Sequence, residues 1–471
     1  MKNRGLIALT IFGLTCLQGQ AKSDPRSLAL GGAYGTVADG IFAVGFNPAL
    51  LAYQTDKPFM LQLFGIDAGI VSNYFSLANL NSISGDTLTD KKKDLLFDTY
   101  FRDRGLTLNQ DLHFPVPMIN YASGNMAITS NAMLLTNLRI PPGMMRLLLY
   151  GNAHDPTLDM ELNLEMLAVA EYGFSFAMPF QSFAVGATLK YLQGIFYLGV
   201  DPDSSHAELR TTDNEVYGSG TYFLRQGIGG SGIGLDLGLV SEEFSDGWRV
   251  GFSLTNTIGR INWNKPSLIK DILGGADKVY GNKDDLWHLV WNGTIITDSL
   301  AIKYSYTIDS LSAQTLSDTG LFTSTQEVVQ NVDAKGKPVS FSTNYPSLLR
   351  ISASKRFPDL VVASDLVTGF ENRFFARAGW TWSIGAELTR FESFPLRIGY
   401  AWGGQDLKQL GLGFGVHKGP VIFDFALAFR NGVWIHTLKG LSLSTSLVIT
   451  SFRSRKESAL PDLPEAPAPS P

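Results

Sequence analysis

Side chains that could carry catalysis or bind a metal ion are sparse in this sequence. Its 471 residues include six histidines and a single cysteine, Cys16. No histidine stands in an H-x-x-x-H or H-E-x-x-H spacing, and no G-x-S-x-G nucleophile motif occurs. We therefore expect no metal, no other cofactor and no enzymatic activity. The alternative is an esterase or phospholipase that assembles Ser and His from separate strands, with His288 or His417 as the base.

Residues 227–232 read GIGGSG and match the G-x-G-x-x-G pattern of dinucleotide-binding loops. That motif binds a pyrophosphate only where a strand precedes it and a helix follows, because the helix N-terminus holds the anion. Here the alternating pattern of a strand follows. We interpret these glycines as residues of a strand edge or a turn.

Charged side chains recur inside otherwise apolar segments and are the remaining candidates for chemistry. In residues 420–430, PVIFDFALAFR, large apolar residues alternate strictly with a face that carries Asp424 and Arg430. The same two-residue period, which indicates a strand, recurs in several other segments. The charged residues on the small or polar faces of these segments are Lys190, Asp236, Arg249, Lys303, Arg377, Glu387, Arg397, Asp424 and Arg430.

The length of the alternating segments favours strands that cross a membrane. Many span about nine residues or more, enough to cross a bilayer when tilted. Aromatic residues gather at their ends, as at Trp380 and Trp382, which is typical of interfacial girdles. We count roughly twelve to fifteen such segments between about residues 57 and 452. We predict an all-β fold, a transmembrane antiparallel β-barrel of about fourteen strands, because bacterial barrels use even numbers. A soluble β-sandwich or propeller is the alternative.

In such a barrel the charged residues must face the lumen, because an Arg or Lys on the lipid face costs roughly 2–4 kcal/mol at the midplane. We expect a salt-bridged network that fills the lumen. The alternative is a polar conduit that opens when an internal segment moves.

Composition and the N-terminus indicate export. Residues 1–21 read as a signal peptide, with Lys2 and Arg4 before an apolar stretch and a cleavage site after Ala21. A membrane anchor or a lipoprotein at Cys16 is the alternative. The mature chain would contain no cysteine, which excludes disulfides and thiolate catalysis. A net charge of −5 without a basic block argues against nucleic-acid binding. No later apolar stretch is long enough for a membrane-spanning helix.

Three segments depart from the strand pattern. Residues 89–104 and 142–150 each have helical spacing and end before a glycine, so we predict two short helices in an early insertion. Residues 453–471 are rich in proline and should form a disordered tail.

Residues 22–56 form a compact, irregular segment before the first expected strand at residue 57. Gly31, Gly32 and Gly35 permit close backbone approach. Asn47 can cap a helix that begins at Pro48, so residues 48–53 should form one or two helical turns. Small side chains and turns suit a chain folded inside the lumen of the barrel.

The same residues carry a resemblance to a known family. Three short segments resemble the N-terminal signature of the FadL/TodX-like outer-membrane proteins, which include PorV-like and TraF-like barrels. The segments are RSLALGGAY at 26–34, VADG at 37–40 and NPALLA at 47–52. Ala29 and Leu50 stand where that signature has glycine. The helical insertions suit an uncharacterised branch. The resemblance implies a fourteen-stranded barrel whose N-terminal segment is a hatch in the lumen, with Gly31, Gly32, Asn47, Pro48 and Ala49 in that role.

The predicted function follows from the barrel and from this resemblance. We expect a passive, channel-type transporter for small hydrophobic, fatty-acid-like molecules in the outer membrane of a Gram-negative-type bacterium, gated by the hatch. Its expected partners are outer-membrane lipid and a hydrophobic ligand. The competing hypotheses are a barrel that serves envelope or secreted proteins during secretion or surface assembly, and a plugged structural barrel.

Overall fold

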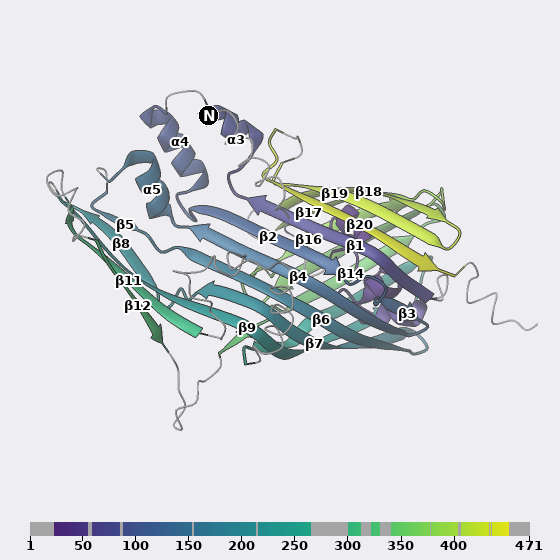
Figure 1. The fold of residues 1–471 in the computed structure, drawn as a ribbon. Helices are drawn as coiled ribbons and strands as arrows, with labels where there is room; N and C mark the ends of the chain where they lie inside the picture. The colour runs from purple at the N-terminus through teal and green to yellow at the C-terminus, as the bar shows by residue number, and fades with distance from the viewer. Residues whose placement is uncertain are drawn as a thin grey trace, which may run out of the picture.

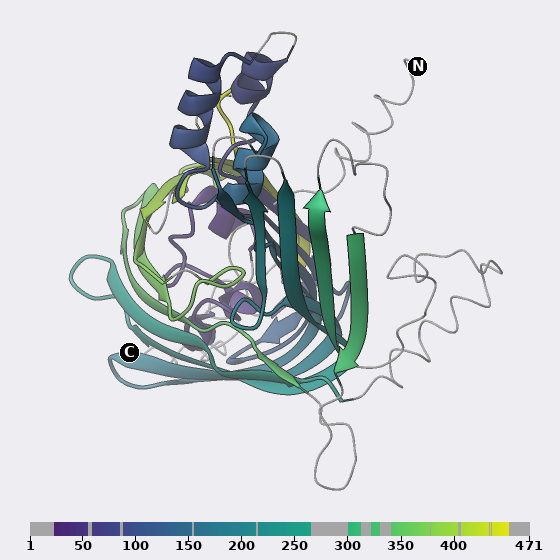
Figure 2. The same ribbon diagram turned by 90° about the vertical axis from the view of Figure 1, so that its left-hand side faces the viewer.

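The protein folds as one closed, antiparallel β-barrel with a segment of chain inside it (Figures 1 and 2). The computed structural model describes residues 23–54, 59–84, 88–152, 155–212, 215–264, 300–311, 322–329, 341–376, 378–403, 407–432, 434 and 436–451. The predicted signal peptide, the proline-rich tail, His288 and Arg377 lie outside these residues.

Fourteen strands form the wall, and each pairs with its neighbour antiparallel. In chain order they are β1 (Phe59–Ser72), β2 (Leu106–Pro115), β4 (Met126–Ile140), β6 (Asn163–Pro179), β7 (Phe183–Val200), β9 (Val216–Ser241), β10 (Trp248–Asn262), β14 (Leu348–Arg356), β15 (Leu360–Gly369), β16 (Thr381–Leu388), β17 (Leu396–Gly403), β18 (Leu407–Lys418), β19 (Val421–Arg430) and β20 (Gly440–Thr450). β20 pairs with β1 and closes the ring, for example at Ile66 opposite Thr445. The predicted transmembrane barrel of about fourteen strands is confirmed.

Side chains alternate across the wall as the sequence pattern predicts. On β19, Val421 and Phe423 face outward and are exposed, whereas Asp424 and Arg430 face inward and are buried. Outward-facing aromatic residues such as Trp382 give the barrel a large apolar exterior. Exposed apolar area of this extent is what a lipid-facing wall requires. Among the helices in the described residues, none is long and apolar enough to cross a membrane.

The two ends of the barrel differ. One end carries short turns, such as Gly124 and Asn125 between β3 (Tyr121–Ser123) and β4. The other carries the long connections, and we call it the long-loop end. The predicted helices form there as α4 (Asp90–Tyr100) and α5 (Pro142–Tyr150), but they belong to two separate loops, and an unpredicted helix, α3 (Leu77–Ile83), precedes α4.

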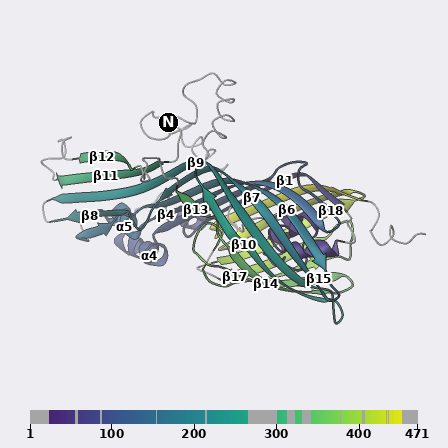
Figure 3. The same ribbon diagram turned by 90° about the horizontal axis from the view of Figure 1, so that it is seen from below.

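A small sheet extends the wall beyond the long-loop end (Figure 3). It forms because β9 is 26 residues long and its first half continues past the ring. This half pairs with β8 (His206–Thr211) and with β11 (Leu300–Leu311); β5 (Thr157–Asp159) and β12 (Phe322–Val329) add the outer strands. A further short strand, β13 (Ser342–Asn344), pairs with the end of β10. Because Lys303 lies on β11, its strand belongs to this extension and not to the closed ring.

Residues 23–54 lie inside the barrel (Figure 2), near its short-turn end (Figure 1), and we call them the plug. The plug contains α2 (Pro25–Ala29) and two 3₁₀ helices, η1 (Gly40–Ala43) and η2 (Pro48–Tyr53). Its apolar side chains, including Tyr34, Phe46 and Leu51, form one buried cluster with inward-facing residues of the wall. The helical turns expected at residues 48–53 are present as η2.

Replacing Asp424 by Leu should lower the thermal stability of the barrel. Asp424 accepts a bond of 2.6 Å from Arg397, and both side chains are buried. Removing one partner of a buried ion pair costs about 3–5 kcal/mol, because the other charge stays buried. The measurement is the temperature at which the folded, faster-migrating gel band of an unheated sample converts to the slower, unfolded one. Asp359→Leu, in an exposed turn, is the control; equal midpoints for both variants would contradict a paired Asp424.

Candidate functional site: a plugged lumen

Glycines in the wall define where the plug docks. A Cβ atom added at Gly186 would overlap the backbone of Pro48 and Ala49, and one at Gly399 would overlap Leu30. Gly31 of the plug has a φ of +65°, and a Cβ there would lie 2.9 Å from the Tyr400 nitrogen. The plug and the wall therefore touch backbone to backbone. This close contact gives a physical reason for glycine at these positions.

Asn47 joins the plug to the wall and also caps η2. Its Oδ1 accepts a hydrogen bond from the Ala49 amide at 3.2 Å, which is the predicted helix cap. Its Nδ2 donates to the carbonyl oxygens of Gly35 at 3.2 Å and of Leu239, on β9, at 3.1 Å. The Gly32 carbonyl accepts from Arg350, on β14, at 2.8 Å. The residues predicted for the hatch thus lie at the contact between plug and wall.

Ion pairs run from the plug into the wall. Arg26 of the plug pairs with Glu387 at 2.6 Å and with Asp39 at 2.8 Å. Glu387 also pairs with Arg397 at 3.5 Å, which in turn binds Asp424 at 2.6 Å. Three of the charges predicted to face the lumen are therefore brought together around a plug residue.

A second pair anchors the plug on the neighbouring strands β14 and β15. Asp365, on β15, binds Arg350 at 2.6 Å and accepts hydrogen bonds from the amides of Tyr34 and Gly35 at 2.9 Å. Sequence reasoning missed Arg26, Arg350 and Asp365. The alternation of residues 348–356 and 360–369 could have indicated that Arg350 and Asp365 face inward, but not that they face each other.

The remaining predicted charges lie apart from this network. Lys190 is buried, with Asp236 at 2.8 Å and Glu171 at 4.0 Å. Arg249 lies 3.5 Å from Glu243 and over the ring of Tyr53 in the plug. Arg430 is buried on β19. Within the described ranges, no group of three or more His, Cys, Asp or Glu side chains could hold a metal ion.

The wall is interrupted at β2. β2 ends at Pro115, and the regular ladder with β1 and β4 resumes at β3. Between them single backbone bonds remain, from the Val116 amide to the Ser130 carbonyl at 2.8 Å and from the Met118 amide to the Gln62 carbonyl at 2.9 Å. The side chain of Asn120 bridges the interruption, since it donates to the Ser130 carbonyl at 3.2 Å and accepts from the Ser130 amide at 2.6 Å. Met118 and Ile119, within the interruption, are exposed.

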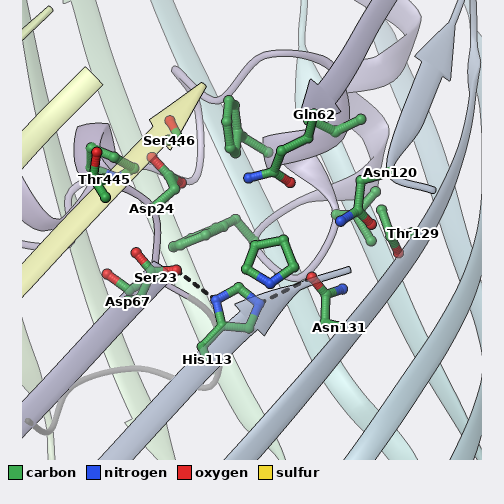
Figure 4. Close-up of a pocket in the computed structure, with 16 residues that line it drawn as sticks. Ser23, Asp24, Gln62, Asp67, His113, Asn120, Thr129, Asn131, Thr445 and Ser446 are labelled. Atoms are coloured by element: carbon green, nitrogen blue, oxygen red, sulfur yellow. Dashed lines mark hydrogen bonds and ion pairs between the residues drawn. The ribbon is translucent and has the colours of Figure 1, made fainter. Parts of the chain in front are cut away.

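A small pocket lies between this interruption and the plug (Figure 4). Its cavity of about 30 Å³ is bordered by Asp24 of the plug and by Asp67, His113 and Asn131 of the wall. His113 bonds to Asp67 at 2.6 Å and to Asn131 at 3.0 Å. Burial raises the pKa of Asp24 to about 7, and the nearby Asp67 carboxylate acts in the same direction.

An aromatic cluster, which we call the aromatic layer, lies within the barrel on the long-loop side of the plug. Trp263, Tyr345 and Phe374 are fully buried there, together with Tyr197. The indole of Trp263 lies against Gly194, Gly227 and Gly230, where any Cβ would meet the ring. The interpretation of residues 227–232 as a strand edge or turn is therefore corrected: they lie within β9, and Gly227 and Gly230 make room for an indole.

Beyond the aromatic layer, at the long-loop end, lies a cavity of about 990 Å³ that we call the vestibule. Most of its lining is polar, including Asn137, Glu165 and Arg373. The lumen thus contains, in order, a polar vestibule, an aromatic layer, buried charges and the plug.

Comparison with known proteins finds similarity chiefly at the level of the fold. A family model described as "Family of unknown function (DUF5723)" matches residues 48–222. None of the curated proteins matches the chain. The toluene transporter TbuX of Ralstonia pickettii is similar over 91% of this chain and 98% of its own, with 13% identity and a TM-score of 0.47. The CymD monoaromatic hydrocarbon channel is similar over 93% and 99%, with 14% identity and a TM-score of 0.49. A FadL homologue of Pseudomonas aeruginosa is similar over 92% and 100%, with 12% identity and a TM-score of 0.45. These similarities are similarities of overall fold.

Docking of the plug should weaken as the pH rises. In the docked plug the pKa of Asp24 is about 7, against an ordinary value of 3.8. Docked Asp24 therefore holds a proton that released Asp24 gives up, so the stabilisation is full below 3.8 and is lost as the pH rises towards 7. Protease resistance of the plug should be higher at about pH 5 than at about pH 8. Asp24→Asn keeps the capping oxygen but cannot ionise, and it should remove most of this difference; an unchanged difference would exclude Asp24 as its cause.

Gly227→Val should destabilise the barrel by about 1–3 kcal/mol, because the new side chain must displace the indole of Trp263. The measurement is again the midpoint of the heat-induced gel shift. In a Trp263→Ala background the same substitution should cost much less, because the indole is gone. A cost that is equal in the two backgrounds would show that Gly227 does not serve to accommodate the indole.

Proposed function

We propose that the protein is a passive, channel-type transporter of the outer membrane, with the plug as its gate and small hydrophobic molecules as its cargo. The observation that carries the proposal is the polar character of the wall behind the plug. Buried serines face inward from the wall at the level of the plug or of its ion pairs, as do the charged residues described above. These serines are Ser253, Ser352, Ser383 and Ser444. Because this surface is compatible with water, the wall would stay intact after the plug moves.

A permanently filled interior has no need for such a surface. Buried ion pairs are often no more stabilising than well-packed apolar residues of the same volume. The plug is held by ion pairs, by hydrogen bonds and by an apolar cluster, and its described residues add no strand to the wall. These are contacts that one rearrangement can break and remake.

The interruption at β2 supports a lateral exit for a hydrophobic molecule. The plug side of the pocket there is lined by Ile41, Phe42, Val44 and Phe46. On the outer side, Met118 and Ile119 are exposed on the lipid-facing wall. A molecule that passed between these two surfaces would reach the bilayer without crossing the polar lumen.

The long-loop end favours a second candidate function, in which the barrel binds envelope or secreted proteins during their secretion or surface assembly. The extension of β5, β8, β9, β11 and β12 protrudes beyond the ring, and Leu95 and Leu148 on the neighbouring helices are 70% and 75% exposed. Apolar side chains this exposed on a surface above the membrane can bind another protein.

A reversible lock of the plug tests the gate. A Cβ on Gly35 would lie 3.0 Å from the Ser352 Cβ, so Gly35→Cys/Ser352→Cys should form a disulfide after a small adjustment. Oxidised protein in liposomes should admit a small aromatic hydrocarbon much more slowly than reduced protein. The rate of hydrocarbon entry through each single-cysteine variant should be the same before and after oxidation.

Two outcomes would contradict the gated channel. Equal flux through the locked and unlocked barrel would mean that the plug is not the gate. Absence of flux in both states, with no hydrophobic molecule extracted from protein purified from membranes, would contradict transport of such cargo. Co-purification of large envelope proteins would then favour the second candidate.

A further inference from the structure

The vestibule has features of a binding site in its own right. Its volume of about 990 Å³ is at the upper end of the range of roughly 300–1,000 Å³ for ligand pockets. The aromatic layer of Trp263, Tyr345 and Phe374 separates it from the plug. A ligand could therefore occupy the vestibule while the plug stays docked.

Strand register builds one side of the vestibule as a polar row. Asn109 on β2 lies opposite Asn137 on β4, and Asn137 lies opposite Glu165 on β6. The row continues through Gly199 on β7 to Arg225 on β9. All five residues line the cavity, so five neighbouring strands contribute one position each at the same level.

The vestibule contains two ion pairs, and the charged groups of each pair are already bonded to each other. Arg373 donates from Nε to Glu165 at 2.8 Å, and the hydroxyl of Tyr197 donates to the same carboxylate at 2.8 Å. Arg225 pairs with Asp201 at 2.5 Å. A charged ligand would have to compete with these partners, and the lining carries five carboxylates and four guanidinium groups, which leaves no strong net charge to attract an ion.

Four asparagine side chains that line the vestibule, by contrast, form no hydrogen bond with any described residue. They belong to Asn109, Asn137, Asn163 and Asn344. The Oδ1 atom of Asn137 is buried without a partner among those residues. Each amide offers one acceptor oxygen and two N–H donors, and an amide left unpaired away from water loses stabilising interactions.

We propose that the vestibule binds a neutral, hydroxyl-rich ligand, an oligosaccharide. A sugar hydroxyl both donates and accepts, so it can bond to either end of an amide and leave the ion pairs intact. A hydrocarbon would leave the amides unpaired, which is the costly outcome for a polar site. The site lies outside the proposed gate, so it adds surface recognition of a sugar to the transport function.

Glycan binding to the purified full-length protein tests this site. The protein should be held in an amine-oxide detergent, because alkyl glycoside detergents carry a sugar and would compete. An array of neutral oligosaccharides identifies the tightest binder, and calorimetry gives its Kd. Asn109→Ala/Asn137→Ala should weaken binding by about tenfold or more, as expected for the loss of at least one good hydrogen bond. Asn81→Ala, on the exposed surface of α3, is the matched control and should bind as the wild type does.

The outcomes separate the proposal from its alternatives. Absence of binding to every neutral glycan, binding only of anionic sugars, or equal Kd values for the double variant and the wild type would each overturn it. Liposomes that contain lipopolysaccharide provide a second arm: binding there supports the site and identifies its sugar as part of a membrane glycolipid, whereas binding to free glycans identifies a soluble source. The oxidised Gly35→Cys/Ser352→Cys protein should bind the glycan unchanged, so failure of the gate and failure of this site give different results.

Discussion

Closure of the sheet between β1 and β20 is the constraint on which the rest of the structure depends. Lipid offers no hydrogen-bond partners, so a strand edge within the bilayer would leave backbone groups unpaired at a cost of several kcal/mol each. The ring removes both edges and creates an interior. Where the regular ladder is interrupted after Pro115, the Asn120 side chain accepts from the Ser130 amide, and it donates to the Ser130 carbonyl together with the Val116 amide.

The interior then has to be filled, and it is filled by chain that is not part of the sheet. The plug approaches the wall closely because glycines such as Gly186 and Gly399 lack a Cβ, and its charged residue Arg26 joins the pairs of the wall. The aromatic layer uses the same principle, with glycines of β7 and β9 around the Trp263 indole. Small residues in the wall thus set the places where a large or irregular element can dock.

The lumen combines surfaces of different chemistry along its axis, and each suits a different task. Polar wall and ion pairs lie around the plug, where movement would expose them to water. Apolar plug residues such as Phe42 and Val44 face the interruption in the wall, next to lipid. Unpaired amides occupy the vestibule, above the aromatic layer. A gate, a lateral exit and a site for a hydroxyl-rich ligand are therefore compatible within one barrel.

The sequence by itself determined the barrel and the direction of its side chains, because the two-residue period is a local property of each strand. It left the strand number between about twelve and fifteen, because the period does not show which strands pair; the segment at Leu300–Leu311 pairs in the extension and not in the ring. It also determined the cap at Asn47 and the two predicted helices, which depend on neighbouring residues only. Which charges meet, as Arg26 meets Glu387, was decided by the tertiary structure, because strand register and plug position bring together residues 361 positions apart. For the same reason the glycines of residues 227–232 became interpretable only with Trp263 beside them, and Lys303 could be assigned to the extension only once the partners of β11 were known.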